Sequence, residues 1–167
     1  AGKFAFWVEP VGDAEARKKF YETVAVAAVM ANFEFTKYKT PPKEGFDYVQ
    51  EIQAIWPKEN AAIKAGFKAG MVIGEEVNNC RELANTPGGD MTPEILADHA
   101  RRDAKGLPIK IQTLDEKKIK ELGMGGVMGV SRGSDAPPQF IVMEYWGAQK
   151  SEKPVVLVGK GVTFDTG

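Results

Sequence analysis

A lysine and an aspartate lie five positions apart near the end of the chain, within the segment GKGVTFDTG of residues 159–167. Lys160 stands between two glycines and follows the apolar run 155–158, which predicts a strand buried on both faces. Because glycine has no Cβ, a ligand can come close to the backbone beside this lysine. We therefore interpret Lys160 and Asp165 as a candidate ligand-binding pair at the carboxyl end of a strand.

Metal binding is the chemistry that this pair suits best. A neutral lysine amine can ligate a metal ion whereas an ammonium cannot, and a divalent cation nearby drives the proton off. A carboxylate such as Asp165 is an ordinary metal ligand. The local pattern alone leaves a second interpretation open, in which Lys160 is a surface cation and Asp165, before Thr-Gly, forms a turn.

Two glycine-rich segments fail as nucleotide-binding motifs. A phosphate-binding loop needs a glycine five positions before the Gly-Lys pair and a hydroxyl residue after it, but Pro154 and Gly161 occupy these positions. In residues 123–129, Met128 stands where the dinucleotide fingerprint needs its third glycine. We interpret both segments as turns.

The composition is that of a soluble globular protein. The 167 residues are 43% hydrophobic and 27% charged, with a formal net charge of -1, so no attraction to nucleic acid or to an anionic membrane follows. Cys80 is the single cysteine, which excludes a disulfide within the chain. No stretch approaches the roughly 20 apolar residues of a membrane span. We expect a cytoplasmic protein without a membrane or nucleic-acid partner.

The first half of the chain predicts strands at residues 4–8 and 48–56 and helices at 14–32 and 59–84. Asp13 is a suitable N-cap for the first helix. We expect that helix to bury a stripe with Phe20, Val24 and Ala28. The second helix carries a face of mostly small residues, which predicts close approach of a neighbouring backbone. This face comprises Ala62, Gly66, Ala69, Ile73, Val77, Cys80 and Ala84.

The second half alternates helices and strands. Thr92-Pro93-Glu94 is a typical helix start, and we expect that helix to reach residue 105. Strands are predicted at 109–114, 140–146 and 155–158, a short helix at 115–122, and a glycine-rich loop at 123–133. This order indicates an α/β fold with a mixed sheet.

Several segments in order resemble the leucyl (cytosol) aminopeptidase family of dinuclear-metal exopeptidases. Residues 158–167, VGKGVTFDTG, are similar to the family's metal-binding signature. Further similar segments are CRELANTP at 80–87 with MTP at 91–93, MGGVMGVSRGS at 124–134 with Pro137-Pro138, and FTKYK at 35–39.

The resemblance implies a domain organisation. Residues 1–57 would be the end of an N-terminal α/β domain, 58–84 a connecting helix, and 85–167 the beginning of a catalytic α/β domain. We therefore expect the chain to be an internal fragment that ends in the first metal-ligand motif.

The resemblance also implies a function. The complete protein would be a metalloaminopeptidase that releases N-terminal, leucine-type residues from peptides by two-metal hydrolysis. Lys160 would bind one of two divalent ions, zinc or manganese, and Asp165 would bridge both. No catalytic residue is assigned in this chain, because the family's further ligands, second lysine and arginine would follow it. We expect a hexamer of the complete protein and an inactive 167-residue chain.

Two other functions stay open at this stage. The chain could be a non-catalytic scaffold of the same family, or a DNA-binding or nucleotide-binding fragment. The near-zero net charge and the lack of a basic stripe argue against phosphate contacts.

Overall fold

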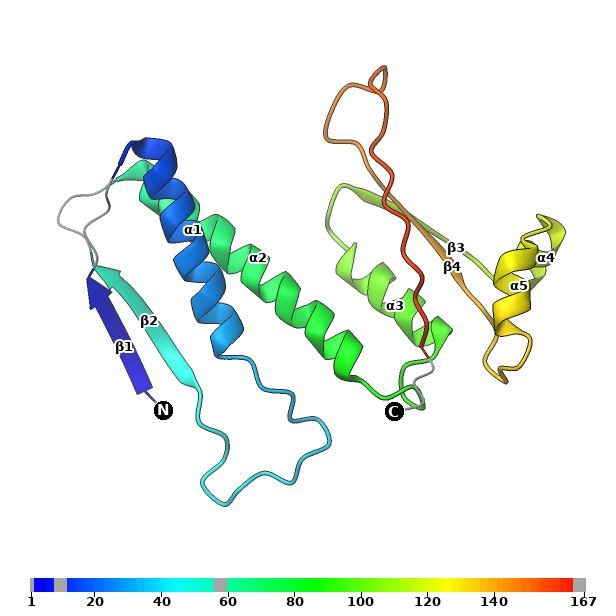
Figure 1. Ribbon diagram of the computed structural model, residues 1–167, viewed down its shortest axis with the longest axis horizontal. Coiled ribbons are helices and arrows are strands. Elements are labelled where there is room, and N and C mark those ends of the chain that lie inside the picture. The colour runs from blue at the N-terminus through cyan, green and yellow to red at the C-terminus, as the bar shows by residue number, and fades with distance from the viewer. Residues whose placement is uncertain (1, 8–11, 56–59, 164–167) are drawn as a thin grey trace. The chain divides into compact units, whose positions relative to one another are not determined.

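The computed structural model describes residues 2–7, 12–55 and 60–163. The chain divides into two compact units, residues 1–85 and 86–167. Each unit contains both helices and strands, which confirms the predicted α/β class (Figure 1). No helix in the described ranges is long and apolar enough to cross a membrane.

The first unit begins with a parallel strand pair. Strands β1 (Gly2–Trp7) and β2 (Val49–Ile55) pair in parallel, and helix α1 (Ala14–Ala31) lies between them in the chain. Two parallel strands cannot be joined by a tight turn and need a long crossover connection, which here contains α1. Lys3 lies opposite Glu51 in the register, with 2.5 Å between the lysine Nζ and a carboxylate oxygen. Both strands were predicted.

Helix α1 begins at the predicted cap. The Asp13 carboxylate accepts the backbone N–H of Ala16 at 2.9 Å. The buried stripe, however, runs through Tyr21 and Ala25, which are both 0% exposed. Phe20 is 41% exposed, so the expectation of a stripe with Phe20 was wrong. The second helix of the unit packs on the face of α1 that carries Tyr21, and Phe20 lies one residue away from that face. Burial raises the pKa of the Tyr21 phenol.

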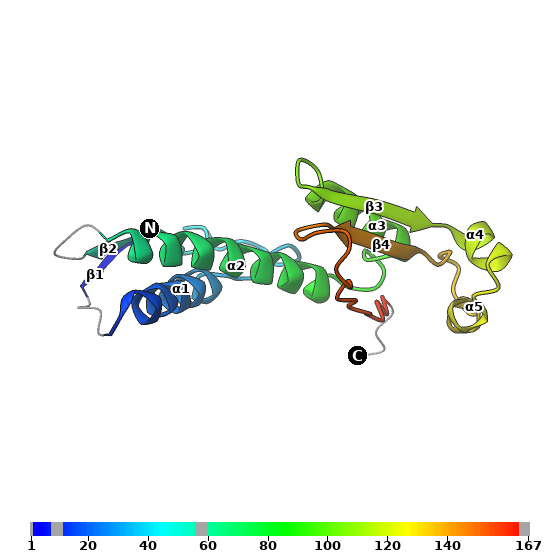
Figure 2. The ribbon, with the colours of Figure 1, turned by 90° about the horizontal axis from the view of Figure 1, so that it is seen from above.

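Helix α2 (Ala61–Asn85) packs along α1, as both views show (Figures 1 and 2). The contact is made at three glycines four residues apart. A Cβ at Gly66 or Gly70 would lie 2.2 Å from the carbonyl oxygen of Lys18 or Glu22, respectively, and one at Gly74 would lie 2.8 Å from Val29 Cβ. The predicted close approach of a neighbouring backbone is confirmed.

The buried face of α2 differs in part from the predicted one. Ile63 is buried together with the three glycines, whereas Ile73 is 44% exposed and Cys80 is exposed. The glycine line sets which side faces α1, because only there can the two backbones approach. Ile73 and Cys80 lie off that line, so their predicted burial was wrong.

Two side chains of α2 cap the end of α1. Asn78 donates to the carbonyl of Val29 at 3.0 Å, and Arg81 donates to the carbonyl of Met30 at 2.9 Å. The guanidinium of Arg81 also lies 4.2 Å from the ring centroid of Phe33. These bonds satisfy carbonyls at the last turn of α1, where a cation is also favoured by the helix dipole.

The described residues of the second unit, 86–163, form an antiparallel strand pair and three helices. Helix α3 (Pro93–Asp103) begins at Thr92, whose hydroxyl accepts the Ile95 N–H at 3.3 Å. Strands β3 (Ile109–Leu114) and β4 (Phe140–Tyr145) pair with Ile109 opposite Tyr145. These three elements were predicted.

The glycine-rich segment forms a helix, and its prediction as a loop was wrong. Helix α4 (Glu116–Glu121) starts at the predicted cap Asp115, and Gly123, which has a φ of +66°, follows its C-cap Leu122. The N–H of Met124 reaches the carbonyl of Ile119 at 3.1 Å, as in a Schellman motif. Helix α5 (Gly125–Ser131) follows at once and packs against α4. Of the glycines in this segment, Gly123 adopts a positive φ, at the turn between α4 and α5.

Candidate functional site

Lys160 lies in an irregular segment, residues 153–163, and is exposed. Its carbonyl accepts the N–H of Val162 at 3.1 Å. Asp165 lies outside the described residues. The structure therefore places one of the two predicted metal ligands and leaves their mutual geometry a prediction.

The apolar run before Lys160 is not a strand. Residues 155–158 are 91%, 73%, 93% and 92% exposed, respectively, and their backbone groups bond to no other described residue. The prediction of a buried strand was therefore wrong for this structure. An apolar run can become a buried strand only where neighbouring strands take up its N–H and C=O groups and other elements cover its faces. Neither happens within the described ranges.

The glycines beside Lys160 differ in their surroundings. A Cβ at Gly159 would meet nothing within 4 Å, so the backbone there is open to a ligand. A Cβ at Gly161 would lie 3.2 Å from Leu96 Cδ2, which is tight. Leu96 belongs to α3, so Gly161 is the point at which the irregular segment passes that helix.

The described residues do not form a metal site by themselves. Within residues 2–7, 12–55 and 60–163, no group of three or more histidine, cysteine, aspartate or glutamate side chains is placed to hold an ion. A divalent ion in a protein needs about four to six ligands. Lys160 and Asp165 alone could not supply them.

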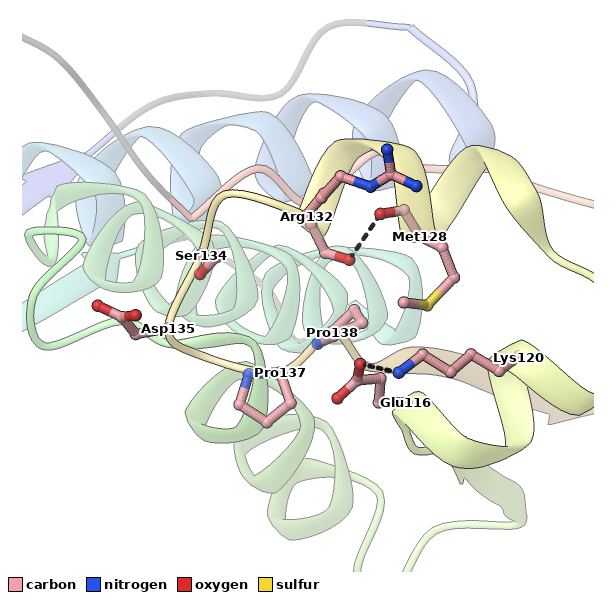
Figure 3. A pocket seen from close by; sticks show the side chains of 9 residues that line it. Glu116, Lys120, Met128, Arg132, Ser134, Asp135, Pro137 and Pro138 are labelled. Carbon is pink, nitrogen blue, oxygen red and sulfur yellow. Dashed lines mark hydrogen bonds and ion pairs between the residues drawn. The ribbon is translucent and has the colours of Figure 1, made fainter.

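A pocket of about 670 Å³ lies between α4, α5 and the turn that follows α5 (Figure 3). Figure 3 shows the Met128 side chain on one side and the paired side chains of Glu116 and Lys120 across from it. Its lining residues are Glu116, Lys120, Met128, Ser131, Arg132, Ser134, Asp135, Pro137 and Pro138. Sequence reasoning missed this pocket because it expected a loop in place of α5.

Four of the six polar side chains that line this pocket are hydrogen-bonded or ion-paired. Lys120 Nζ lies 2.5 Å from Glu116 Oε1, and the Ser131 hydroxyl donates to the Met128 carbonyl at 3.2 Å. The Ser134 hydroxyl accepts a backbone N–H two residues further on, at 3.2 Å. Neither histidine nor cysteine lines the pocket, and the hydrogen bonds of both serine hydroxyls are to backbone groups.

Residues 78–167 match the family model described as the cytosol aminopeptidase family, catalytic domain. The match begins at Asn78, in the last part of α2, and includes the whole segment around Lys160 and Asp165.

Curated relatives are named probable cytosol aminopeptidase. A probable cytosol aminopeptidase of Bdellovibrio bacteriovorus is 41% identical over 149 residues, which is 89% of this chain and 30% of that protein. One of Methylibium petroleiphilum is 48% identical over 120 residues, 71% of this chain and 25% of that protein. The chain thus spans between a quarter and a third of the relatives that it matches.

Solved structures show the same fold. A mutant of tomato leucine aminopeptidase matches with a TM-score of 0.73 at 24% identity, over 83% of this chain and 28% of that one. The bottromycin maturation enzyme BotP in complex with Mn matches with a TM-score of 0.65 at 24% identity, over 84% of this chain and 29% of that one.

Proposed function

The chain belongs to the cytosol aminopeptidase family, and from this premise we propose that the whole protein is an aminopeptidase. It would hydrolyse the first peptide bond of peptides that carry a free amino end. The observation that carries this proposal is the match of residues 78–167 to the catalytic domain of the family. Two bacterial relatives that are named probable cytosol aminopeptidase support this proposal.

We propose Lys160 and Asp165 as ligands of two divalent metal ions, zinc or manganese. An amine and a carboxylate are suitable donors for either metal, and a related structure is described as a complex with Mn. Such ions, when bound, polarise a carbonyl and make a bound water acidic. Lys160 would contribute its neutral amine and Asp165 a shared carboxylate, and the remaining ligands would come from outside the 167 residues.

The organisation of the whole protein is proposed on the same resemblance. Residues 1–57 would end an N-terminal domain, 58–84 would connect, and 85–167 would begin the catalytic domain. We also propose that the whole protein prefers leucine-type residues, assembles as a hexamer and is located in the cytoplasm. Lys160 and Asp165 could not hold two ions by themselves, so we expect the 167-residue chain alone to be inactive.

Release of leucine from a short leucyl peptide tests the proposal. The whole protein, loaded with Zn²⁺ or Mn²⁺, should release leucine, and a chelator should abolish the release. The matched control is the same peptide with an acetylated amino end, which should not be cleaved. Equal cleavage of the acetylated peptide, or no cleavage of either peptide, would contradict an aminopeptidase.

A further inference from the structure

Gly161 is a glycine whose backbone conformation does not require one. Its φ lies outside the left-handed region that favours glycine. The N–H of Val162 bonds to the carbonyl of Lys160 at 3.1 Å, which closes a three-residue turn around Gly161. The backbone of this turn therefore leaves room for a residue with a side chain, and another constraint must act at position 161.

That constraint is the space beside Leu96. An ideal Cβ at Gly161 would lie 3.2 Å from Leu96 Cδ2, which is closer than an ordinary contact between carbon atoms. At Gly159, on the other side of Lys160, a Cβ would meet nothing within 4 Å. The missing side chain at position 161 thus lets the turn that follows Lys160 pass close to Leu96.

Helix α3, which carries Leu96, is held at several points. The Thr92 hydroxyl caps its first turn, and Ala97, next to Leu96, is 0% exposed. Further along the helix, Arg101 Nη2 lies 2.5 Å from the hydroxyl oxygen of Thr113 in β3. Leu96 therefore belongs to a supported element, whereas Gly161 belongs to an irregular one.

We propose that Leu96 is a positioning residue for Lys160. It lies against Gly161 and so fixes the backbone directly after the lysine, which keeps the amine where the metal ion binds. Leu96 has no donor atom and acts on the ion only through Lys160. This role rests on the proposed function, because it requires Lys160 to be a metal ligand. The contact lies within the second unit and does not depend on a free surface.

A methyl group at position 161 should displace the turn and not the helix. Leu96 is half-buried on α3, whereas Lys160, Gly161 and Val162 are exposed. The collision is therefore relieved mainly by movement of the turn, and Lys160 moves with it. Metal ligands tolerate little displacement, and loss of a group that orients one costs about 10- to 100-fold in metal affinity.

Mn²⁺ binding to the whole protein tests this role, measured by the electron paramagnetic resonance of the free ion. Lys160→Met identifies the relevant site as the one that it weakens. Gly161→Ala should weaken that site about tenfold. The double variant Gly161→Ala with Leu96→Ala removes the collision and should bind within about threefold of the unsubstituted protein. The control is Ile95→Ala in place of Leu96→Ala, since Ile95 is a 38% exposed neighbour on the same helix, and it should restore nothing.

The melting temperature of the metal-free protein separates positioning from stability. Gly161→Ala should leave it within about 2 °C of the unsubstituted protein, because the turn is exposed. A loss of affinity that is matched by a large fall in melting temperature would overturn the proposal. So would an unchanged affinity in Gly161→Ala, or equal recovery with Leu96→Ala and Ile95→Ala. These outcomes leave the proposed function intact, whereas Mn²⁺ binding that is unaffected by Lys160→Met would overturn both.

Discussion

The carbonyl oxygen of Lys18 lies where a side chain of Gly66 would begin, 2.2 Å from an ideal Cβ. The contact joins the backbones of α1 and α2, so no side-chain rotation can relieve it. Gly66→Ala should therefore lower the free energy of unfolding of the first unit by about 2 kcal/mol, even though alanine favours a helix. Urea denaturation followed by circular dichroism measures the change.

Gly129→Ala is the matched control for this substitution. Gly129 also lies within a helix, α5, but a Cβ there meets nothing within 4 Å. The free energy of unfolding should stay unchanged or rise by up to about 1 kcal/mol. If both variants are equally stable or both are destabilised alike, the close approach of α1 and α2 does not control stability.

Arg81 should stabilise the first unit through the end of α1. Arg81→Leu removes the bond to the Met30 carbonyl at 2.9 Å and the contact with the Phe33 ring. We expect a loss of about 1–2 kcal/mol in the free energy of unfolding. Lys68→Leu removes an exposed charge from the same helix and should change stability by less than about 0.5 kcal/mol. Similar losses in the two variants would argue against the capping role.

The pair of Lys3 and Glu51 predicts an acid titration. Hydrogen bonds from Lys3 and then Gln53 lower the pKa of the Glu51 carboxyl from its ordinary value. Because the pKa of Glu51 is lowered in the folded state, the pair stabilises the fold at pH values above the unfolded pKa, about 4.3. This stabilisation is lost as the pH falls through the lower pKa of the folded state. In Lys3→Met the pKa should rise, as carboxyl carbon shifts in NMR can measure. An unchanged pKa would show that the lysine does not act on Glu51.

Local signals in the sequence predicted the starts of three helices. Asp13, Thr92 and Asp115 each accept a backbone N–H at the predicted helix start, because an N-cap depends only on the next few residues. The small residues of the second predicted helix likewise predicted a close helix contact, because glycine costs helix stability and needs a compensating contact.

Predictions that depend on distant partners were less successful. The burial of residues 155–158 requires neighbouring strands, and the described residues provide none. The face of α2 that carries Cys80 looked equally apolar, but the close approach at the glycines decided which side is buried. In the candidate site, residue types predicted donors for a metal, whereas the mutual placement of Lys160 and Asp165 depends on structure beyond the described residues.

Lys160 should be essential in the whole protein. Lys160→Met should reduce the release of leucine by more than about 100-fold. Loss of a residue that only hydrogen-bonds a metal ligand costs about 10- to 100-fold, and loss of the ligand itself should cost more. Lys153→Met, in the same exposed segment, should retain full activity. Equal activity of the two variants would remove Lys160 from the proposed site.

Anomalous scattering from a crystal of the whole protein, soaked with Mn²⁺, tests the proposed metal centre most directly. We predict two ions, one bound to the Lys160 amine and both bound to the Asp165 carboxylate. Ions that lie elsewhere, or no ion beside either side chain, would contradict the assignment of this chain to a two-metal aminopeptidase site.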